Sequence, residues 1–319
     1  PLNMDIRKKV AQFCNVDLGS VIESRDVDTI YEVPLMMRDE KLDLTVLKKL
    51  DLDTRRELHL EKWSNFVNKL KNPKKQINVG LVGKYVELPD SYKSIQESFI
   101  HSGAVNQCKV EVTTIHSEDI TPENIQDVMK DLHGILIAPG FGQRGIDGKI
   151  LAARYARENN LPFLGVCLGM QCAVVEFARN VLGYREADST EFTRRTPYPV
   201  IDLMEEQKNI TEKGGTMRLG SYPCNIKRNS KVHKIYNTAK IRERHRHRYE
   251  FNNAFLKDFE NAGMLATGIN PETDLVEIIE IPEHRWFVGV QSHPEYKSTV
   301  LHPHPLFVAF VGEMCSKAE

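Results

Sequence analysis

From Gln76 onward, short apolar segments alternate with segments whose apolar residues recur at helical spacing. The apolar segments lie at 77–85, 109–117, 134–140 and 161–169. Strands that are apolar along almost their whole length, and that alternate with helices, are typical of a parallel sheet covered on both faces. We therefore predict an α/β fold with an open, mostly parallel sheet and helices on both faces. Segments 215–227 and 275–281 predict added antiparallel strands.

Polar and turn residues set the expected limits of the helices. One helix is expected from about Ser91 to Ile100, with Gly103 as its stop. A second is expected to begin at Thr121, which would serve as its N-cap. The apolar residues of this second helix share one face, which would lie against the sheet: Ile125, Val128, Met129 and Leu132.

Three regions are expected along the chain. Residues 1–37 resemble the last elements of a domain whose body is absent, and residues 38–75 form a charge-rich linker with helices, anchored by Trp63. Residues 76–319 form the main domain, and the KNPKK segment at 71–75 marks a boundary. Because the chain begins at Pro1, inside sequence of folded type, we expect it to be part of a longer protein.

Composition narrows the class of protein. Lys and Arg total 43 against 44 Asp and Glu, which gives no reason to expect a nucleic acid or an anionic membrane as a partner. No apolar run is long enough to span a bilayer, and no secretory leader is present. The cysteines are scattered without a CxxC pair, which predicts a reducing cytoplasm, no disulfide framework and no metal site: Cys14, Cys108, Cys167, Cys172, Cys224 and Cys315.

The segment Gly165-Val166-Cys167-Leu168-Gly169 joins a buried strand to a helix. Glycines around a nucleophile at such a junction allow the tight turn that presents it at the top of a sheet. A helix N-terminus also favours a thiolate. The alternative is a structural cysteine at a strand end, the usual role of an isolated free cysteine.

A candidate base follows a second buried strand. His293 and Glu295 are two residues apart in QSHPE (291–295), and Pro294 restricts the turn between them. A thiol nucleophile needs a base, and the base needs an orienting acceptor. The alternative is a solvated loop.

Two further segments offer binding groups. In Pro139-Gly140-Phe141-Gly142, backbone N–H groups could face a developing oxyanion, although Gly-rich turns are common. The Arg/His segment IRERHRHRYE (241–250) lacks the alternating aromatic residues of an RNA-binding surface. One of its cations could instead pair with a substrate carboxylate.

These motifs together resemble a known family. LGVCLGMQ (164–171), QSHPEY (291–296) and the Gly-Phe-Gly turn are similar to those of the triad (class I) glutamine amidotransferases. Within that class, four segments resemble the CTP synthase family: VELPDSYKS (86–94), DSTEF (188–192), GGTMRLG (214–220) and RHRHRYEFNN (244–253). CNV (14–16) and RDVDTIYEVP (25–34) look like the end of its synthase (amidoligase) domain.

The resemblance implies a flavodoxin-like fold and a role for each matching residue. Cys167 would be the nucleophile, His293 the base and Glu295 its orienting acid. The oxyanion donors would be Gly140 and Leu168. Glutamine would be held by Gln171, Glu191, Arg248 and the backbone of Leu168, Gly169 and Met170. Arg25, Asp26 and Val27 match a segment that lines an ATP adenine pocket.

One departure from the family pattern is visible. Many members have Pro-Gly-Gly-Phe-Gly where this chain has Ala138-Pro139-Gly140-Phe141-Gly142. Pro139 has no N–H, so an oxyanion contact from this turn must come from a neighbour, and Gly140 keeps its own donor.

The resemblance also implies partners. Glutamine would be hydrolysed to glutamate and ammonia, and the ammonia would be used to aminate UTP to CTP in a synthase domain with ATP and Mg. The glutaminase step would need no cofactor, GTP would activate it allosterically, and the full enzyme would be a cytoplasmic homotetramer.

Three alternatives remain open at this point. The first is another class I amidotransferase subunit, and the Arg/His segment and DSTEF of this chain argue against it. A γ-glutamyl peptidase would need no partner domain. A non-catalytic regulatory module would have a broken triad, whereas Cys167, His293 and Glu295 are all present.

Overall fold

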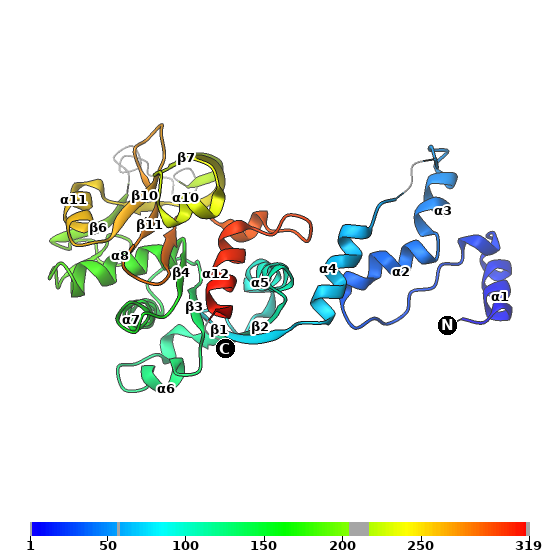
Figure 1. Ribbon diagram of the computed structural model, residues 1–319, viewed down its shortest axis with the longest axis horizontal. Coiled ribbons are helices and arrows are strands. Elements are labelled where there is room, and N and C mark those ends of the chain that lie inside the picture. The colour runs from blue at the N-terminus through cyan, green and yellow to red at the C-terminus, as the bar shows by residue number, and fades with distance from the viewer. Residues whose placement is uncertain (1, 56–57, 204–216, 317–319) are drawn as a thin grey trace. The chain divides into compact units, whose positions relative to one another are not determined.

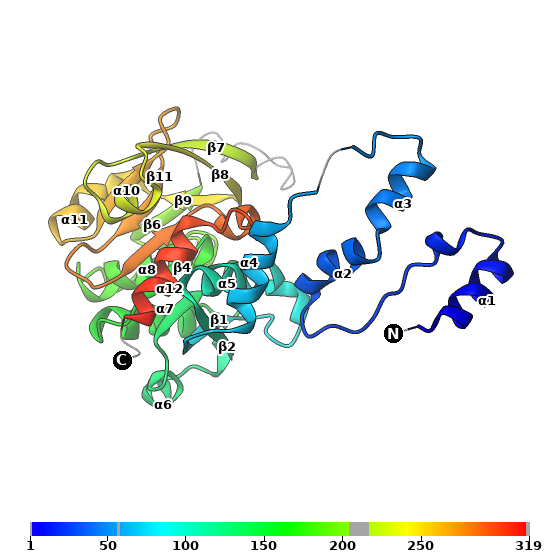
Figure 2. The same cartoon turned by 45° about the vertical axis from the view of Figure 1, so that its right-hand side comes forward.

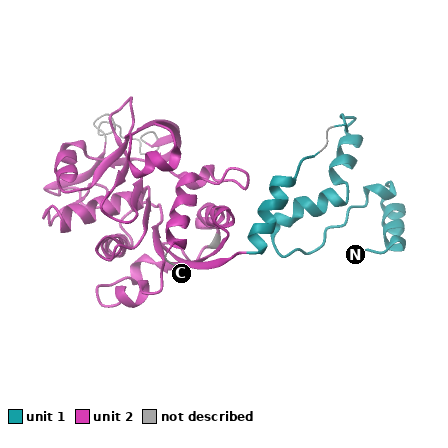
Figure 3. Cartoon of the chain, viewed as in Figure 1, with its two compact units in different colours: residues 1–72 teal, residues 73–319 magenta. Residues whose placement is uncertain are grey.

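The computed structural model describes residues 2–55, 58–203 and 217–316. The chain divides into two compact units, residues 1–72 and 73–319, drawn in separate colours in Figure 3. The finer division at residues 37 and 75 stays a prediction. The strand-like segment that begins at residue 215, and the first residues of the GGTMRLG motif, lie partly outside the described residues.

The first unit consists of short helices: α1 (Met4–Cys14), α2 (Val33–Asp39), α3 (Leu42–Lys49) and α4 (Glu61–Lys71). Trp63 of α4 donates its indole N–H to the Tyr31 carbonyl at 2.7 Å, and the Tyr31 ring packs edge-on against Phe66 with centroids 5.0 Å apart. Arg7 pairs with Glu23 at 2.9 Å and with Glu40 at 2.7 Å. Aromatic packing and one ion-pair group therefore join segments that are distant in sequence.

In the described part of the second unit, the main sheet has nine strands in the order β2-β1-β3-β4-β12-β11-β10-β7-β8. The first five are parallel and the rest antiparallel. The parallel strands are β1 (Lys75–Gly83), β2 (Cys108–His116), β3 (Gly134–Ile137), β4 (Phe163–Val166) and β12 (Phe287–Val290). The antiparallel strands are β7 (Arg218–Ile226), β8 (Lys240–His247), β10 (Leu265–Ile269) and β11 (Val276–Glu280).

Helices cover both faces of this sheet (Figures 1 and 2), as the sequence predicted. On one face, α5 (Lys93–Asn106) and α12 (Pro305–Cys315) pack together through Phe99 and Phe307, whose ring centroids are 5.4 Å apart. On the other face, α7 (Ile146–Glu158) and α8 (Leu168–Asn180) contribute to a second core. The shorter helices are α6 (Ile125–Met129), α10 (Lys231–Tyr236) and α11 (Leu256–Asn261). The predicted α/β fold with added antiparallel strands is therefore confirmed.

A second, three-stranded sheet has the order β5-β6-β9 and consists of β5 (Ala187–Ser189), β6 (Tyr198–Leu203) and β9 (Tyr249–Phe251). The chain passes from β8 of the main sheet to β9 of this sheet with Arg248 alone between them. Glu191 lies two residues after β5. The second sheet therefore presents two residues that are far apart in sequence.

Two predicted helix limits are wrong. Gly103 does not end α5, which runs on to Asn106, and Gln107 takes the left-handed conformation there with a φ of 53°. Gly103 is instead buried where a Cβ would lie 2.7 Å from the Cys108 carbonyl oxygen, so close packing explains the glycine. Thr121 does not cap α6, because Asn124 precedes the helix and accepts a hydrogen bond from the Thr121 N–H.

No helix within the described ranges is long and apolar enough to cross a membrane.

This packing predicts the effect of an alanine at Gly103. Alanine favours helices, yet the added methyl group would press on the backbone of Cys108, so we expect Gly103→Ala to destabilise the domain by about 1–2 kcal/mol. Denaturant unfolding would measure this, with Ser94→Ala on the exposed side of α5 as the control. An unchanged or higher stability for Gly103→Ala would contradict the packing explanation.

Candidate active site

Cys167 lies in a sharp turn between β4 and α8. Its backbone has φ 53° and ψ −104°, a conformation that a residue other than glycine adopts only when the surrounding structure enforces it. Its N–H donates to the Val290 carbonyl of β12 at 2.7 Å. A Cβ on Gly169 would collide with the Ile137 backbone, and one on Gly165 would lie 2.8 Å from Gly169. The glycines around Cys167 are therefore required by close backbone contacts.

His293 and Glu295 form a buried pair at the end of the neighbouring strand. β12 runs parallel to β4, and η7 (Pro294–Lys297) follows His293 directly. The His293 Nδ1 lies 2.8 Å from the Glu295 Oε1, and the His293 N–H donates to the Arg244 carbonyl at 2.8 Å. Since Nδ1 is engaged by the carboxylate, Nε2 is the ring nitrogen left for the Cys167 sulfur.

The charge state of His293 depends on these neighbours. Burial alone would lower the pKa of His293, but attraction to the Cys167 sulfur and the Glu295 carboxylate raises it to about 11. A protonated imidazole beside a cysteine is the arrangement that activates cysteine nucleophiles. Cys172, five residues on, is buried inside α8, and burial raises the pKa of its thiol to about 12. The two cysteines therefore differ sharply in their surroundings.

Sequence reasoning gave Gln291 no role, although it lies in the same QSHPE motif. Its side chain is completely buried, with Nε2 3.6 Å from the Cys167 Sγ. Its Oε1 accepts a hydrogen bond from Gln171 at 3.2 Å, and Gln171 also donates to the Tyr249 carbonyl at 3.0 Å. Gln171 therefore links the nucleophile turn to the second sheet.

Two buried lysines support the Pro-Gly-Phe-Gly turn, and sequence reasoning missed both. Lys84, at the end of β1, donates to the Phe141 carbonyl, and Lys149 of α7 donates to the Ala138 carbonyl at 2.7 Å. Burial lowers the pKa of Lys149 to about 8. A lysine directly after a buried strand was the available signal for Lys84, whereas Lys149 lies among apolar helix residues and gave none.

The turn and the nucleophile are adjacent. A Cβ on Gly140 would lie 3.5 Å from the Leu168 side chain and 3.3 Å from that of Lys84. Leu168 is the first residue of α8, so the helix does not use its N–H, and the next two residues, Gly169 and Met170, follow in the same turn. The turn that contains Gly140 therefore lies next to the first residue of α8, which directly follows Cys167.

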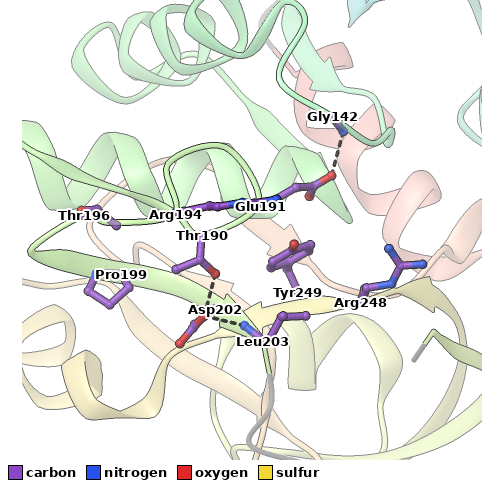
Figure 4. A pocket seen from close by; sticks show the side chains of 10 residues that line it. All are labelled: Gly142, Thr190, Glu191, Arg194, Thr196, Pro199, Asp202, Leu203, Arg248 and Tyr249. Atoms are coloured by element: carbon purple, nitrogen blue, oxygen red, sulfur yellow. Dashed lines mark hydrogen bonds between the residues drawn. The ribbon is translucent and has the colours of Figure 1, made fainter. Parts of the chain in front are cut away.

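A pocket of about 780 Å³ is present beside this region (Figure 4). Glu191 reaches across it to accept a hydrogen bond from the Gly142 N–H at 2.8 Å. Burial raises the pKa of Glu191, while the Gly142 N–H, Lys84 and Arg248 act in the opposite direction. The lining residues are Gly142, Thr190, Glu191, Arg194, Thr196, Pro199, Asp202, Leu203, Arg248 and Tyr249.

The structure therefore brings Glu191 and Arg248 to one pocket. Cys167 does not line this pocket, but two of the lining residues, Gly142 and Tyr249, are linked to residues near the thiol. Gly142 is two residues beyond Gly140. The Tyr249 carbonyl accepts a hydrogen bond from Gln171, which lies one helical turn after Cys167.

The segment matched to an ATP pocket lies in the first unit. Arg25, Asp26 and Val27 line a pocket of about 370 Å³ together with Asp28, Glu32, Leu35, Met36 and Asp39. Its apolar side chains suit a purine ring, whereas its carboxylates would repel phosphates. The residues present thus fit the base end of a nucleotide better than the phosphate end. Within residues 2–55, 58–203 and 217–316, no group of three His, Cys, Asp or Glu side chains could hold a metal ion.

The chain matches the models of two known protein families. The family model described as glutamine amidotransferase class-I matches residues 87–312, and that described as CTP synthase N-terminus matches residues 1–52. Because the first match covers most of the chain, the protein belongs to the class-I glutamine amidotransferase family. Its relatives place it, within that family, among the CTP synthases.

Those relatives include CTP synthase of Cytophaga hutchinsonii, 61% identical over 98% of this chain and 58% of the relative. CTP synthase of Flavobacterium johnsoniae is 57% identical over the same shares. The glutaminase domain of Trypanosoma brucei CTPS, solved with bound acivicin, is 36% identical with a TM-score of 0.71, over 76% of this chain and 95% of that one. These matches favour the CTP synthase interpretation over its alternatives. The chain spans less than two thirds of the length of the curated relatives.

The surroundings of His293 predict its protonation. With a pKa raised to about 11, His293 should stay protonated from pH 6 to pH 9, whereas His245, whose pKa burial lowers to about 3, should stay neutral there. NMR of ¹⁵N-histidine-labelled protein would measure the protonation of both rings in one sample. Cys167→Ser and Glu295→Gln should each lower the pKa of His293. A His293 that loses its proton near pH 6.5 in the unaltered protein would contradict the proposed pairing.

Proposed function

We propose that this chain hydrolyses glutamine to glutamate and ammonia, with Cys167 as nucleophile. The observation that carries the proposal is the turn that holds Cys167 in a strained conformation next to the buried pair of His293 and Glu295. A thiol, an imidazole and a carboxylate in this order are the parts that acyl transfer from an amide requires.

The reaction has two stages. The Cys167 sulfur attacks the side-chain amide carbon of glutamine, and His293 gives a proton to the nitrogen, which leaves as ammonia. The resulting γ-glutamyl thioester is then attacked by water, which loses a proton to His293, and glutamate is released. Glu295 holds the imidazole through Nδ1, at 2.8 Å, so that Nε2 does the proton transfer.

The tetrahedral intermediates carry an oxyanion, which the N–H groups of Leu168 and Gly140 would stabilise. The positive end of α8 adds to this effect, because Leu168 is the first residue of a helix of 13 residues. Lys84 and Lys149 hold the carbonyl oxygens of Phe141 and Ala138 on either side of Gly140, which would help to fix the orientation of the Gly140 N–H.

The pocket beside the thiol supplies the charges that free glutamine needs. Arg248 would pair with the α-carboxylate and Glu191 with the α-ammonium group. Gln171 and the backbone of Gly169 and Met170 would contact the side-chain end. The strongest support is that Glu191 and Arg248, 57 residues apart in the numbering, line the same pocket.

In the complete protein, we infer that the ammonia is used by a synthase domain for the ATP- and Mg-dependent amination of UTP to CTP. The match of residues 1–52 to the CTP synthase N-terminus supports this inference. Arg25, Asp26 and Val27 would contact the adenine of ATP there. GTP activation, a homotetramer and a cytoplasmic location are part of the same proposal.

Glutamine hydrolysis tests the proposal directly. The chain should release ammonia from glutamine, and a glutamine-like diazo-ketone should label Cys167 while sparing Cys172. His293→Ala should reduce turnover by about 10³-fold or more, since nucleophile and base act as a unit. Glu295→Gln should reduce turnover by about 10- to 100-fold, because it removes the group that orients His293. Label found mainly on Cys172, or near-normal turnover in His293→Ala, would sink the assignment.

Substrate recognition can be tested separately from the chemistry. Arg248→Ala and Glu191→Ala should each raise KM for glutamine by about 10- to 100-fold, the loss expected for a charge-assisted hydrogen bond. The rate at which iodoacetamide alkylates Cys167 should change little. Lys240→Ala, at the exposed start of β8, is the matched control. A normal KM in either variant would show that the replaced residue does not bind glutamine.

A further inference from the structure

Five buried ionisable side chains form a cluster that the proposed chemistry does not use. Each is at most 7% exposed. Four belong to the main sheet and one, Glu250, to the second sheet. The members are Arg218 of β7, His245 and His247 of β8, Glu250 of β9 and Glu277 of β11.

Arg218 is at the centre of this cluster. One of its terminal nitrogens lies 2.9 Å from the Glu250 Oε1, and the other lies 2.9 Å from the Glu277 Oε1. Its guanidinium also lies over the Tyr222 ring, 4.5 Å from the centroid. A planar guanidinium that contacts two carboxylates fixes their separation and orientation, which a lysine with its single charged atom cannot do.

The histidines fill the space beside the ion pairs. His245 Nδ1 lies 2.8 Å from His247 Nε2 and 3.5 Å from the Glu277 Oε2, and His247 Nδ1 lies 3.3 Å from the Glu250 Oε1. Burial lowers the pKa of both rings, so both are neutral, and it raises the pKa of Glu250 to about 8. Burial also raises the pKa of Glu277, and the Arg218 charge acts against this rise at both carboxyl groups.

The Glu277 end of the cluster leads to the nucleophile. The Glu277 carbonyl accepts the Gln291 N–H at 2.8 Å, and the Gln291 side chain lies 3.6 Å from the Cys167 Sγ. Glu277 is in β11, Gln291 directly follows β12, and these two strands are also held together by their antiparallel ladder.

The Glu250 end leads to the substrate pocket. Glu250 is two residues after Arg248, and between them Tyr249 lines the pocket and accepts a hydrogen bond from Gln171. The second sheet that carries these residues is short, with strands of three, six and three residues. Few ladder hydrogen bonds therefore fix it, and a buried ion pair to the main sheet has a large influence on its position.

We propose that Arg218 is a positioning residue for glutamine hydrolysis, because its bridge from Glu277 to Glu250 joins the main sheet, whose strands lead to the nucleophile, to β9, which directly follows Arg248. The inference rests on the proposed glutaminase function. It assigns Arg218 no contact with the substrate, and it predicts an effect on substrate binding rather than on thiol reactivity.

Two single variants test this on the full chain. Arg218→Met removes the charge at similar length, and Arg218→Lys keeps the charge but not the fork. Both should reduce kcat/KM for glutamine by about tenfold or more, mainly through KM, since a small displacement of a binding group is costly. Alkylation of Cys167 by iodoacetamide should stay within about threefold, because the main sheet holds Cys167 without Arg218.

A double variant separates positioning from stability. Arg218→Met combined with Glu277→Met replaces a buried ion pair with apolar side chains, which is often neutral or stabilising, and Glu250, which also loses Arg218, can take up a proton because burial raises its pKa to about 8. We expect this variant to regain the thermal midpoint of the unaltered protein while kcat/KM stays low. Arg218→Met with Arg248→Ala should be no worse than Arg248→Ala alone, since Arg218 acts through Arg248. Leu219→Ala, on the exposed side of β7, is the control and should leave both measurements unchanged.

The outcomes are distinct. If kcat/KM recovers together with stability in the double variant, Arg218 is a structural residue only and the inference is overturned. If Arg218→Met does not fold, Arg218→Lys decides by the same KM measurement, and a normal KM there overturns the inference. Absence of ammonia release from the unaltered chain would instead remove the proposed function, while Cys167-specific alkylation would still report on the thiol.

Discussion

The parallel pairing of β4 with β12 is the constraint on which the site depends. Val166 pairs with Val290, and the next hydrogen bond joins the Cys167 N–H to the Val290 carbonyl. Since both strands end at the same edge of the sheet, the residues that follow them must meet there. The sulfur of Cys167 and the ring of His293 are thus brought together by strand register, although they are 126 residues apart in the numbering. A shift of one residue in this register would turn one of the two side chains to the other face.

The second sheet adds what the first cannot supply. A nucleophile and a base would attack many amides, and under the proposed function the pocket with Glu191 and Arg248 would limit the substrate to one with both an α-ammonium and an α-carboxylate group. Cys167 and His293 follow strands of the main sheet, whereas Glu191 follows β5 of the second sheet and Arg248 lies between the two sheets. The single residue between β8 and β9, and the side-chain bridge from Gln171 to the Tyr249 carbonyl, are two of the links between them.

The sequence predicted the parts of this structure that have a local signal. Apolar strands, the glycines around Cys167 and the spacing of His293 and Glu295 are patterns over a few residues, and they were sufficient for the fold and for the thiol, imidazole and carboxylate. Gly103 misled the analysis, because its small size serves tertiary packing against Cys108 rather than a helix end. Lys149 gave no signal. Gln291 and most of the Arg218 cluster lie in motifs that the sequence marked, but their contacts could not be predicted, since their partners come from strands and helices that are distant in the chain. The resemblance to a family supplied Glu191 and Arg248, which no local pattern marks.

The short strands of the second sheet have a consequence for the chemical lifetime of the protein. If the second sheet, with strands of three, six and three residues, opened locally, the nine-stranded sheet would still hold Cys167. In such an opened state the sulfur would be accessible to peroxide while glutamine could not bind. Oxidation to a sulfenic acid would then compete with turnover. A bound substrate, by holding both sheets together, would shield the sulfur from oxidative damage in addition to being its reaction partner.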